Sequence, residues 1–193
     1  KYGSWNKLRN SEEAAYIGLT LPRYVARLPY DPDTNPTGDF PFKEEVDGNS
    51  SKDFLWGPAS MLFAQNMVRS FTNSGWCQYL RGPKGGGLVS GLPVHTFNTR
   101  GEDEIKIPVE ISIPDYRELE FANAGFIPLV YRKNTADACF FSAQSIKQAK
   151  KFKDPKDSEN SQLVTNLSYT FSITRMAHYV KSIMRDNIGS SAD

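Results

Sequence analysis

The stretch GFIPLVYRKNTADACFFSAQS, residues 125–145, contains the two clearest strands of this sequence. Residues 126–131 and 138–142 are short, continuous apolar runs, and runs of this length are typical of buried strands. Lys133, Asn134 and Thr135 stand between them and favour a turn. The stretch therefore predicts two consecutive strands joined by a turn.

Further elements are predicted on the N-terminal side of this stretch. Residues 114–123 begin with a proline and an aspartate and end before Gly125, which indicates a helix. Residues 105–113 alternate isoleucine or valine with other residues, which is typical of a strand with one wet face, and Pro108 places that strand at an edge or a bulge. Residues 94–97 also have the composition of a strand.

Residues 57–73 show the clearest helical pattern of the first half of the chain, and Gly75 is expected to end this helix. Its apolar residues form a stripe at helical spacing and a second group beside it: Met61, Ala64, Val68 and Phe71, then Leu62, Phe63 and Met67. They cover more than half of the circumference, so the helix is expected to be buried on most sides or to sit in an assembly.

The N-terminal segment is predicted as a buried strand over residues 14–21, followed by a short helix over residues 22–28. Residues 31–53 contain several prolines and glycines among charged residues and show no periodicity. We therefore expect a loop or an exposed insertion there.

The last segment predicts one long helix over residues 161–188, with Gly189 as its C-terminal cap and Arg185 in its last turn. Its main apolar stripe is Ile173, Met176, Val180 and Ile183. If the stripe is buried, Met176→Asp or Val180→Asp should abolish folding through an unpaired buried charge.

Helices and strands alternate without a sequence repeat. The pattern favours one α/β domain over residues 1–193, with a mixed sheet flanked by helices and one long C-terminal helix.

Composition narrows the class of protein. The 193 residues carry 23 Lys+Arg and 22 Asp+Glu, and this balance argues against a nucleic-acid binder. Hydrophobic residues make up 39%, enough for a packed core, and no apolar run approaches the ~20 residues of a membrane helix. Cys77 and Cys139 are predicted to be reduced core thiols, which favours a cytosolic protein.

The glycines Gly82, Gly85, Gly86 and Gly87 raise the possibility of a phosphate-binding loop. A nucleotide loop of the Walker type needs Lys and then Ser or Thr after its last glycine, whereas Leu88 and Val89 follow here. We therefore expect a tight or flexible turn. A nucleotide- or anion-binding α/β enzyme domain that uses this loop is kept as the alternative.

The remaining candidate residues favour structural roles. Neither histidine has a partner at metal-ligand spacing, so His95 and His178 are expected to pack and form hydrogen bonds. Asp115 and Glu118 fit a capping pattern at a helix start better than acid–base chemistry with Glu110 or Glu120. The lysines at 147–156 favour a solvated loop over an acidic-partner site. We therefore expect no enzyme, and assign no catalytic, cofactor-binding or metal residue.

Several blocks carry a family resemblance: Gly75-Trp76-Cys77, Arg81-Gly82, Gly85-Gly86-Gly87-Leu88-Val89, Gly91-Leu92-Pro93-Val94, Glu118-Leu119, Gly125-Phe126-Ile127-Pro128-Leu129, Phe140-Phe141-Ser142-Ala143-Gln144-Ser145, Arg175-Met176-Ala177-His178-Tyr179-Val180-Lys181 and Arg185-Asp186-Asn187-Ile188-Gly189. In this order and at these spacings, they resemble the large contractile-sheath subunit of bacterial type VI secretion systems (the TssC or VipB family). The family usually has a doubled arginine where this chain has Tyr116-Arg117, which suggests a divergent branch. The Asn-, Lys- and Ser-rich sequence is similar to the IglB branch.

The resemblance implies a structural part of a secretion machine in the bacterial cytoplasm. It implies assembly with a small sheath subunit (TssB, VipA or IglA) and with further copies of itself around a tube of Hcp-type protein. Contraction would drive the tube outward, and an AAA+ unfoldase would recycle the sheath. It also implies that residues 1–193 are the core of a subunit more than twice as long, and that this core cannot polymerise alone.

Overall fold

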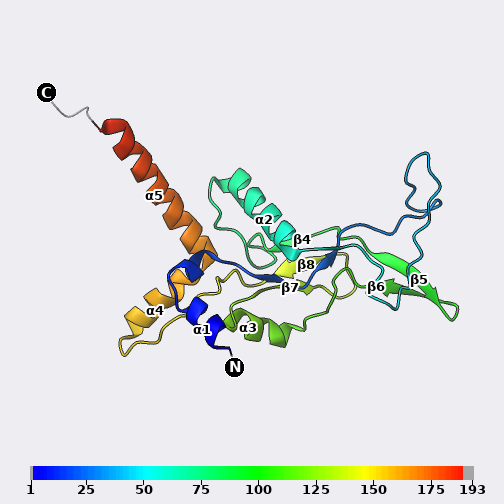
Figure 1. Ribbon diagram of the computed structural model, residues 1–193, viewed down its shortest axis with the longest axis horizontal. Helices are drawn as coiled ribbons and strands as arrows, with labels where there is room; N and C mark the ends of the chain where they lie inside the picture. Colours follow the sequence, from blue (N-terminus) through cyan, green and yellow to red (C-terminus); the bar gives the residue numbers. More distant parts are fainter. Residues whose placement is uncertain (1, 189–193) are drawn as a thin grey trace.

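A mixed four-stranded sheet lies at the centre of the part of the chain that the computed structural model describes, residues 2–188 (Figure 1). Its inner strands are β7 (Ile127–Tyr131) and β8 (Ala138–Phe140), which pair antiparallel. β1 (Thr20–Leu21) runs parallel to β7, and β4 (Leu88–Val89) runs antiparallel to β8. The two strands predicted within residues 125–145 are confirmed, and they are the inner strands of the sheet.

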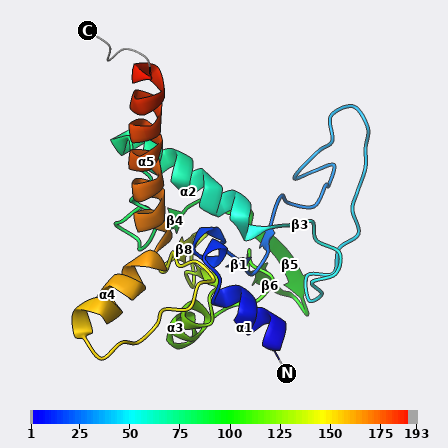
Figure 2. The same cartoon turned by 60° about the vertical axis from the view of Figure 1, so that its left-hand side comes forward.

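Both faces of β7 and β8 are buried. Leu129 and Val130 are at most 2% exposed, and every residue of β8 is fully buried. Consecutive side chains of a strand point to opposite faces, so this burial requires cover on both sides. α2 (Ala59–Ser74) lies on one side of the sheet and α3 (Asp115–Asn123) on the other (Figures 1 and 2). The predicted α/β class, a mixed sheet flanked by helices, is confirmed.

α2 begins and ends close to the predicted residues. Pro58 precedes its first turn, and Gly75 follows its last residue with a φ of 74°. A left-handed residue of this kind at the C-cap position is usually glycine, because glycine has no Cβ to clash. The helix packs on the sheet through Phe63, whose ring meets that of Phe140 edge-on with centroids 5.3 Å apart.

The face of α2 that was expected to be its main apolar stripe points away from the sheet. Met61 and Val68 are 64% and 66% exposed. The buried residues of the helix lie on the opposite side: Ala59, Leu62, Phe63, Asn66 and Ser70. The prediction that α2 is buried on most sides is therefore wrong for this chain alone.

The predicted strand over residues 14–21 and helix over residues 22–28 are largely wrong. Glu13–Tyr16 forms a 3-10 helix, η1, and only Thr20–Leu21 is strand. In place of the helix, β2 (Tyr24–Val25) pairs antiparallel with β3 (Trp56–Gly57). A short helix that was not predicted, α1 (Gly3–Arg9), precedes η1.

Long-range pairing explains why residues 22–28 are extended. The Val25 N–H donates to the Pro108 carbonyl at 2.9 Å, and the Glu110 N–H donates to the Arg23 carbonyl at 2.9 Å. The Arg23 guanidinium also donates twice to the Glu110 carboxylate, at 2.9 and 2.6 Å. These partners are far away in the sequence, and the local pattern does not reveal them.

The same pairing shortens the strand that was predicted over residues 105–113. β5 (His95–Thr99) and β6 (Glu102–Lys106) form a projecting hairpin that turns at Arg100 and Gly101, both with positive φ. β6 ends before Pro108, which has no N–H for the ladder and lies instead beside residues 23–25. The strand over residues 94–97 is confirmed.

The predicted C-terminal helix is two helices, α4 (Pro155–Val164) and α5 (Leu167–Asn187). Asn166 is extended (ψ 116°), and its side chain accepts a hydrogen bond from the Ser168 N–H at 3.0 Å. An asparagine cap of this kind starts a new helix. The expected cap at Gly189 lies outside the described residues. No helix in the described range is long and apolar enough to cross a membrane.

The glycine-rich loop, residues 82–87, closes onto β8. The Gly82 N–H donates to the Phe140 carbonyl at 2.8 Å, and the Phe140 N–H donates to the Gly87 carbonyl at 2.9 Å. A Cβ at Gly87 would collide with the Phe140 carbonyl oxygen and with the backbone of residues 81 and 82. The loop is therefore the tight turn that the sequence predicts, and glycine is required at 87 for close approach to the sheet.

Gly87→Ala should lower the free energy of unfolding by about 2 kcal/mol or more, because the added methyl group forces backbone apart in a packed region. Gly3→Ala is the matched control, since nothing lies within 4 Å of the position of its Cβ and it should change stability by less than about 0.5 kcal/mol. Chemical denaturation of both variants tests this, and equal stabilities would contradict the account of the loop.

Candidate assembly surface

α5 presents an apolar stripe to solvent. The stripe consists of Tyr169, Ile173, Met176, Val180, Ile183 and Met184, all of which are more than 40% exposed. These positions fall on one side of a helix at 100° per residue. The 21-residue helix is about 31 Å long and leaves the body of the molecule (Figures 1 and 2).

Within α5, all of whose residues are described, only Leu167 and Thr170 are buried. Met176 is 52% exposed and Val180 is 55% exposed. The expectation that Met176→Asp or Val180→Asp abolishes folding is therefore wrong for this chain alone, because neither charge would be buried. His178 is exposed as well, so the expectation that it packs is also wrong.

Two features hold the first half of α5. The Leu167 N–H donates to the Ala143 carbonyl at 3.0 Å, which fixes the start of the helix beside the segment after β8. Farther along, the Arg175 guanidinium lies 4.4 Å from the ring centre of Phe71 on α2 and 5.2 Å from that of Trp76. It also donates to the Tyr179 hydroxyl at 2.9 Å. Arg175 thus joins α5 to the end of α2 through cation–π contacts.

α2 carries the second exposed apolar surface, the α2 stripe, which consists of Met61, Val68 and Phe71. Phe71 is 45% exposed beside Arg175, and the other two residues are more exposed than Phe71. The charged residues that lie near this stripe in the sequence have one sign. No acidic residue occurs between Asp53 and Glu102, whereas this interval contains Arg69, Arg81, Lys84 and Arg100.

Arg69 donates to the Leu88 carbonyl at 3.1 Å, so the glycine-rich loop and β4 lie beside the C-terminal half of α2. Arg81 and Lys84 of that loop are exposed. The α2 stripe is therefore an apolar surface with a basic border. A surface of this kind is complementary to an apolar surface with acidic neighbours.

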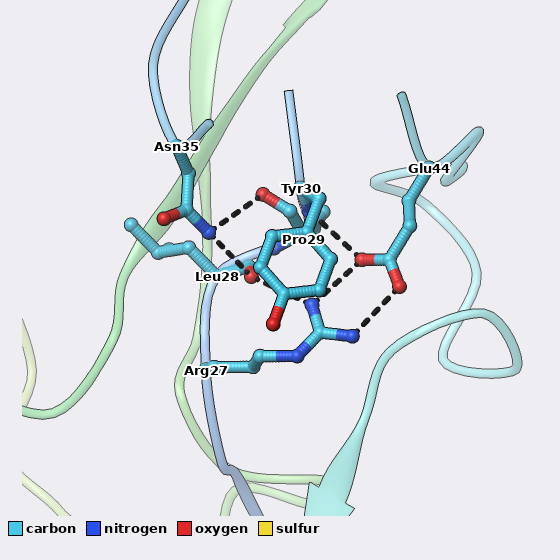
Figure 3. A network of polar contacts seen from close by, with 6 residues as sticks. All are labelled: Arg27, Leu28, Pro29, Tyr30, Asn35 and Glu44. Atoms are coloured by element: carbon cyan, nitrogen blue, oxygen red, sulfur yellow. Dashed lines mark hydrogen bonds and ion pairs between the residues drawn. The ribbon is translucent and has the colours of Figure 1, made fainter. Parts of the chain in front are cut away.

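Residues 31–53 extend from the body without helix or strand, apart from one bridge between Asp31 and Asn35 (Figure 1). The base of this segment is held by an ion pair, shown in Figure 3. The Arg27 guanidinium donates to both oxygens of the Glu44 carboxylate, at 2.8 and 2.7 Å, and lies 3.8 Å from the centre of the Tyr30 ring.

The surrounding polar groups complete this network. Glu44 also accepts from the Tyr30 N–H at 2.9 Å, and the Asn35 amide donates to the Leu28 carbonyl at 3.0 Å (Figure 3). The hydrogen bonds from Arg27 lower the pKa of Glu44 to about 2. An open cavity of about 850 Å³ lies beside the network. It is lined by Glu44, His95 and other residues from 28–53 and 94–96.

The candidate residues for chemistry are not brought together into one site. The His95 ring lies 5.4 Å from that of Phe54, and burial lowers its pKa, so its predicted packing role is confirmed. Both cysteines are free, as predicted, but only Cys139 is a core thiol, since Cys77 is only partly buried. Burial raises the pKa of the Cys139 thiol to about 11. No group of His, Cys, Asp and Glu within residues 2–188 could hold a metal ion.

The carboxylates also have separate roles. Glu110 is bound to Arg23, whereas Asp115 and Glu118 lie in the first turn of α3. Pro114, not Asp115, is the N-cap residue of α3, and no side chain caps this end, so the expected capping pattern is wrong in detail. Acidic residues in a first turn still favour the helix dipole.

The lysine-rich segment, residues 147–156, is largely solvated, as predicted. Lys150, Lys151, Lys153 and Lys156 are exposed, and the ammonium group of Lys147 donates to the Ser11 carbonyl at 3.0 Å.

Sequence reasoning did not predict the Arg27–Glu44 pair or the Arg175 contacts with α2. The only sequence signal for the first was an Arg before the aperiodic segment and a Glu within it. For the second there was an Arg within an aromatic-rich helix. Neither signal identifies a partner.

Comparison with known proteins gives consistent matches along the chain. Residues 1–147 match the VipB family, described as EvpB/VC_A0108, tail sheath N-terminal domain. Residues 156–193 match the VipB_2 family, described as EvpB/VC_A0108, tail sheath gpW/gp25-like domain. The chain is 47% identical over 191 residues to the type VI secretion system sheath protein TssC1 of Pseudomonas aeruginosa PAO1. The alignment covers 98% of the chain and 38% of that relative.

The Arg27–Glu44 pair should make stability depend on acid pH. Because the folded pKa of Glu44 lies below its ordinary value of 4.5, the pair stabilises the fold above about pH 4.5 and is lost as the pH falls towards 2. We expect Glu44→Gln to be less stable than the unsubstituted chain at pH 7, by about 1 kcal/mol. Denaturant unfolding between pH 7 and 2 should show this difference shrinking.

Glu45→Gln is the matched control, because Glu45 is the neighbouring carboxylate and is exposed. It should leave the pH dependence of unfolding close to that of the unsubstituted chain. If Glu44→Gln and Glu45→Gln gave the same pH profile, the role of the Arg27–Glu44 pair would be refuted.

Proposed function

The chain belongs to the EvpB/VC_A0108 tail-sheath family, and from this membership we propose that it forms part of the large subunit of a bacterial type VI secretion contractile sheath. It assembles with the small sheath subunit and with further copies of itself around an Hcp-type inner tube. Contraction of the sheath in the cytoplasm drives the tube outward and propels effectors from the cell. An AAA+ unfoldase recycles the contracted sheath. The chain spans 38% of the length of the relative TssC1.

The observation that carries this proposal is the outward α2 stripe, within the residues matched by the tail sheath N-terminal domain. Met61 and Val68 stay exposed although α2 covers the sheet with its other side. An exposed apolar patch with a polar border favours contact with another polypeptide. Because the border is basic, the surface of the neighbouring sheath subunit that meets it is expected to carry carboxylates.

The architecture also suits a part that transmits force. In a contractile sheath, energy is held in contacts between subunits that have an extended and a contracted packing. The subunit must stay rigid while those contacts change. α2 is packed on the sheet through Phe63 and is joined to α5 through Arg175, so a load on the α2 stripe passes into the core.

This proposal gives the glycine-rich loop a structural role instead of a catalytic one. The N–H groups of Gly82, Gly85 and Gly87 all donate to backbone carbonyls of the loop or of β8. A phosphate loop instead turns such N–H groups towards the anion. The alternative of an anion-binding enzyme domain therefore has no supporting geometry in this loop.

Val68→Glu in the full-length subunit should block sheath assembly without unfolding the protein. Val68 is 66% exposed, so the fold should lose less than about 0.5 kcal/mol, while the carboxylate faces an acidic partner surface and is desolvated there. The test is co-expression with the small sheath subunit, followed by electron microscopy for tubules.

Asn160→Glu is the control, since it adds the same charge at an exposed position of α4 that lies outside the α2 stripe. Tubules should form with this variant as they do with the unsubstituted subunit. If tubules also formed normally with Val68→Glu, the α2 stripe would not be an assembly contact. The absence of tubules from the unsubstituted pair would overturn the proposed function itself.

A further inference from the structure

The α5 stripe differs from the α2 stripe in the way its helix is supported. α2 packs along the sheet, whereas α5 leaves the body after Arg175 and carries its later apolar residues outward (Figure 2). Ile183 and Met184, in its last turns, are 60% and 64% exposed. Helices in proteins obtain most of their stability from packing of an apolar face. The outer part of α5 lacks this packing within residues 2–188.

The family matches divide the chain at the start of α4 (Pro155–Val164), so that α4 and α5 fall in one match. One family model ends at residue 147, and a different one, for a gpW/gp25-like domain, covers residues 156–193. The described part of that second match consists of α4 and α5, and no residue of α4 is buried. A segment of about 40 residues is too short to bury a core of its own.

We propose that the α5 stripe is the inner face of this gpW/gp25-like domain, and that the polypeptide which follows residue 193 in the full-length subunit covers it. The relative supports this occupant in two ways: the aligned region is only 38% of TssC1, and the gpW/gp25-like match follows the N-terminal-domain match and runs to residue 193. The α5 stripe is thus part of the fold of one subunit. This packing does not require sheath assembly, and it goes beyond the proposed function.

The chemistry of the covering segment follows from the stripe and its border. The apolar residues from Tyr169 to Met184 extend over about 22 Å, which corresponds to four turns of helix. Lys181 and Arg185 line the same shallow depression as Val180 and Met184. Because Arg185 is already paired with Asp186 at 3.2 Å, the covering segment is expected to present an apolar face of similar length with a carboxylate beside Lys181.

The stripe can be probed in the full-length subunit expressed without the small sheath subunit. Met176→Cys places a thiol on the stripe, and His178→Cys places one on the exposed opposite side of the same helix turn. Modification by an uncharged thiol reagent is followed by peptide mass spectrometry, which separates these thiols from Cys77 and Cys139. The 193-residue chain with the same substitutions is the reference.

We expect both thiols to react at similar rates in the 193-residue chain. In the full-length subunit, the thiol of Met176→Cys should react at least about tenfold more slowly, because reaction requires local opening of the covered stripe. The thiol of His178→Cys should keep its rate.

As a second measurement, Val180→Asp should lower the melting temperature of the full-length subunit by several degrees, with His178→Asp as the control.

Equal reactivity of Met176→Cys in both proteins would overturn the proposal. Protection that depended on protein concentration would assign the stripe to a second copy, and protection only after addition of the small sheath subunit would assign it to that partner. Either result would also overturn it. None of these outcomes depends on tubule formation, so a failure of the proposed function remains distinguishable.

Discussion

The burial of both faces of β7 and β8 is the constraint on which the rest of the molecule depends. Apolar side chains alternate across these strands, so each face needs its own cover, and α2 and α3 supply it from opposite sides. The backbone groups of Phe140 are paired with the glycine-rich loop, because buried amides and carbonyls are costly without partners. Gly87 is needed there for the loop to approach closely enough.

This constraint also explains why apolar surface remains outside. α2 turns Leu62 and Phe63 towards the sheet and cannot use Met61 or Val68 for the same purpose, because those residues lie on the other side of the helix. α5 is bound through its first turn, Phe171 and Arg175, and the apolar residues of its outer part have no sheet to cover. In the proposed sheath subunit, the first surface meets a neighbouring subunit and the second is covered by the same polypeptide.

Elements with strong local signals could be predicted from the sequence. Continuous apolar runs identified β7 and β8, and Gly75 marked the end of α2. The errors occur where distant residues pair. Residues 22–28 are extended because Arg23 and Val25 pair with residues 108–110, and Asn166 starts a new helix where the apolar periodicity continues. In the candidate site, the apolar stripes of α2 and α5 could be predicted from the helical spacing of their residues. The Arg27–Glu44 and Arg175 contacts could not, because they join residues that are not neighbours on one helix or on paired strands.

Propensity and periodicity are local properties of the chain, so the order of residues is enough to predict the spacing of the apolar positions and the ends of most helices. The sequence also carried the family resemblance, which the family matches over residues 1–147 and 156–193 confirm. Which side of each helix faces inward depends instead on the tertiary contacts. A side chain is buried only when a second surface packs against it. The helical spacing of Met61 and Val68, or of Met176 and Val180, identifies an apolar face but does not show what packs against that face. Residues that the pattern assigned to a core are therefore found on the outside of this chain.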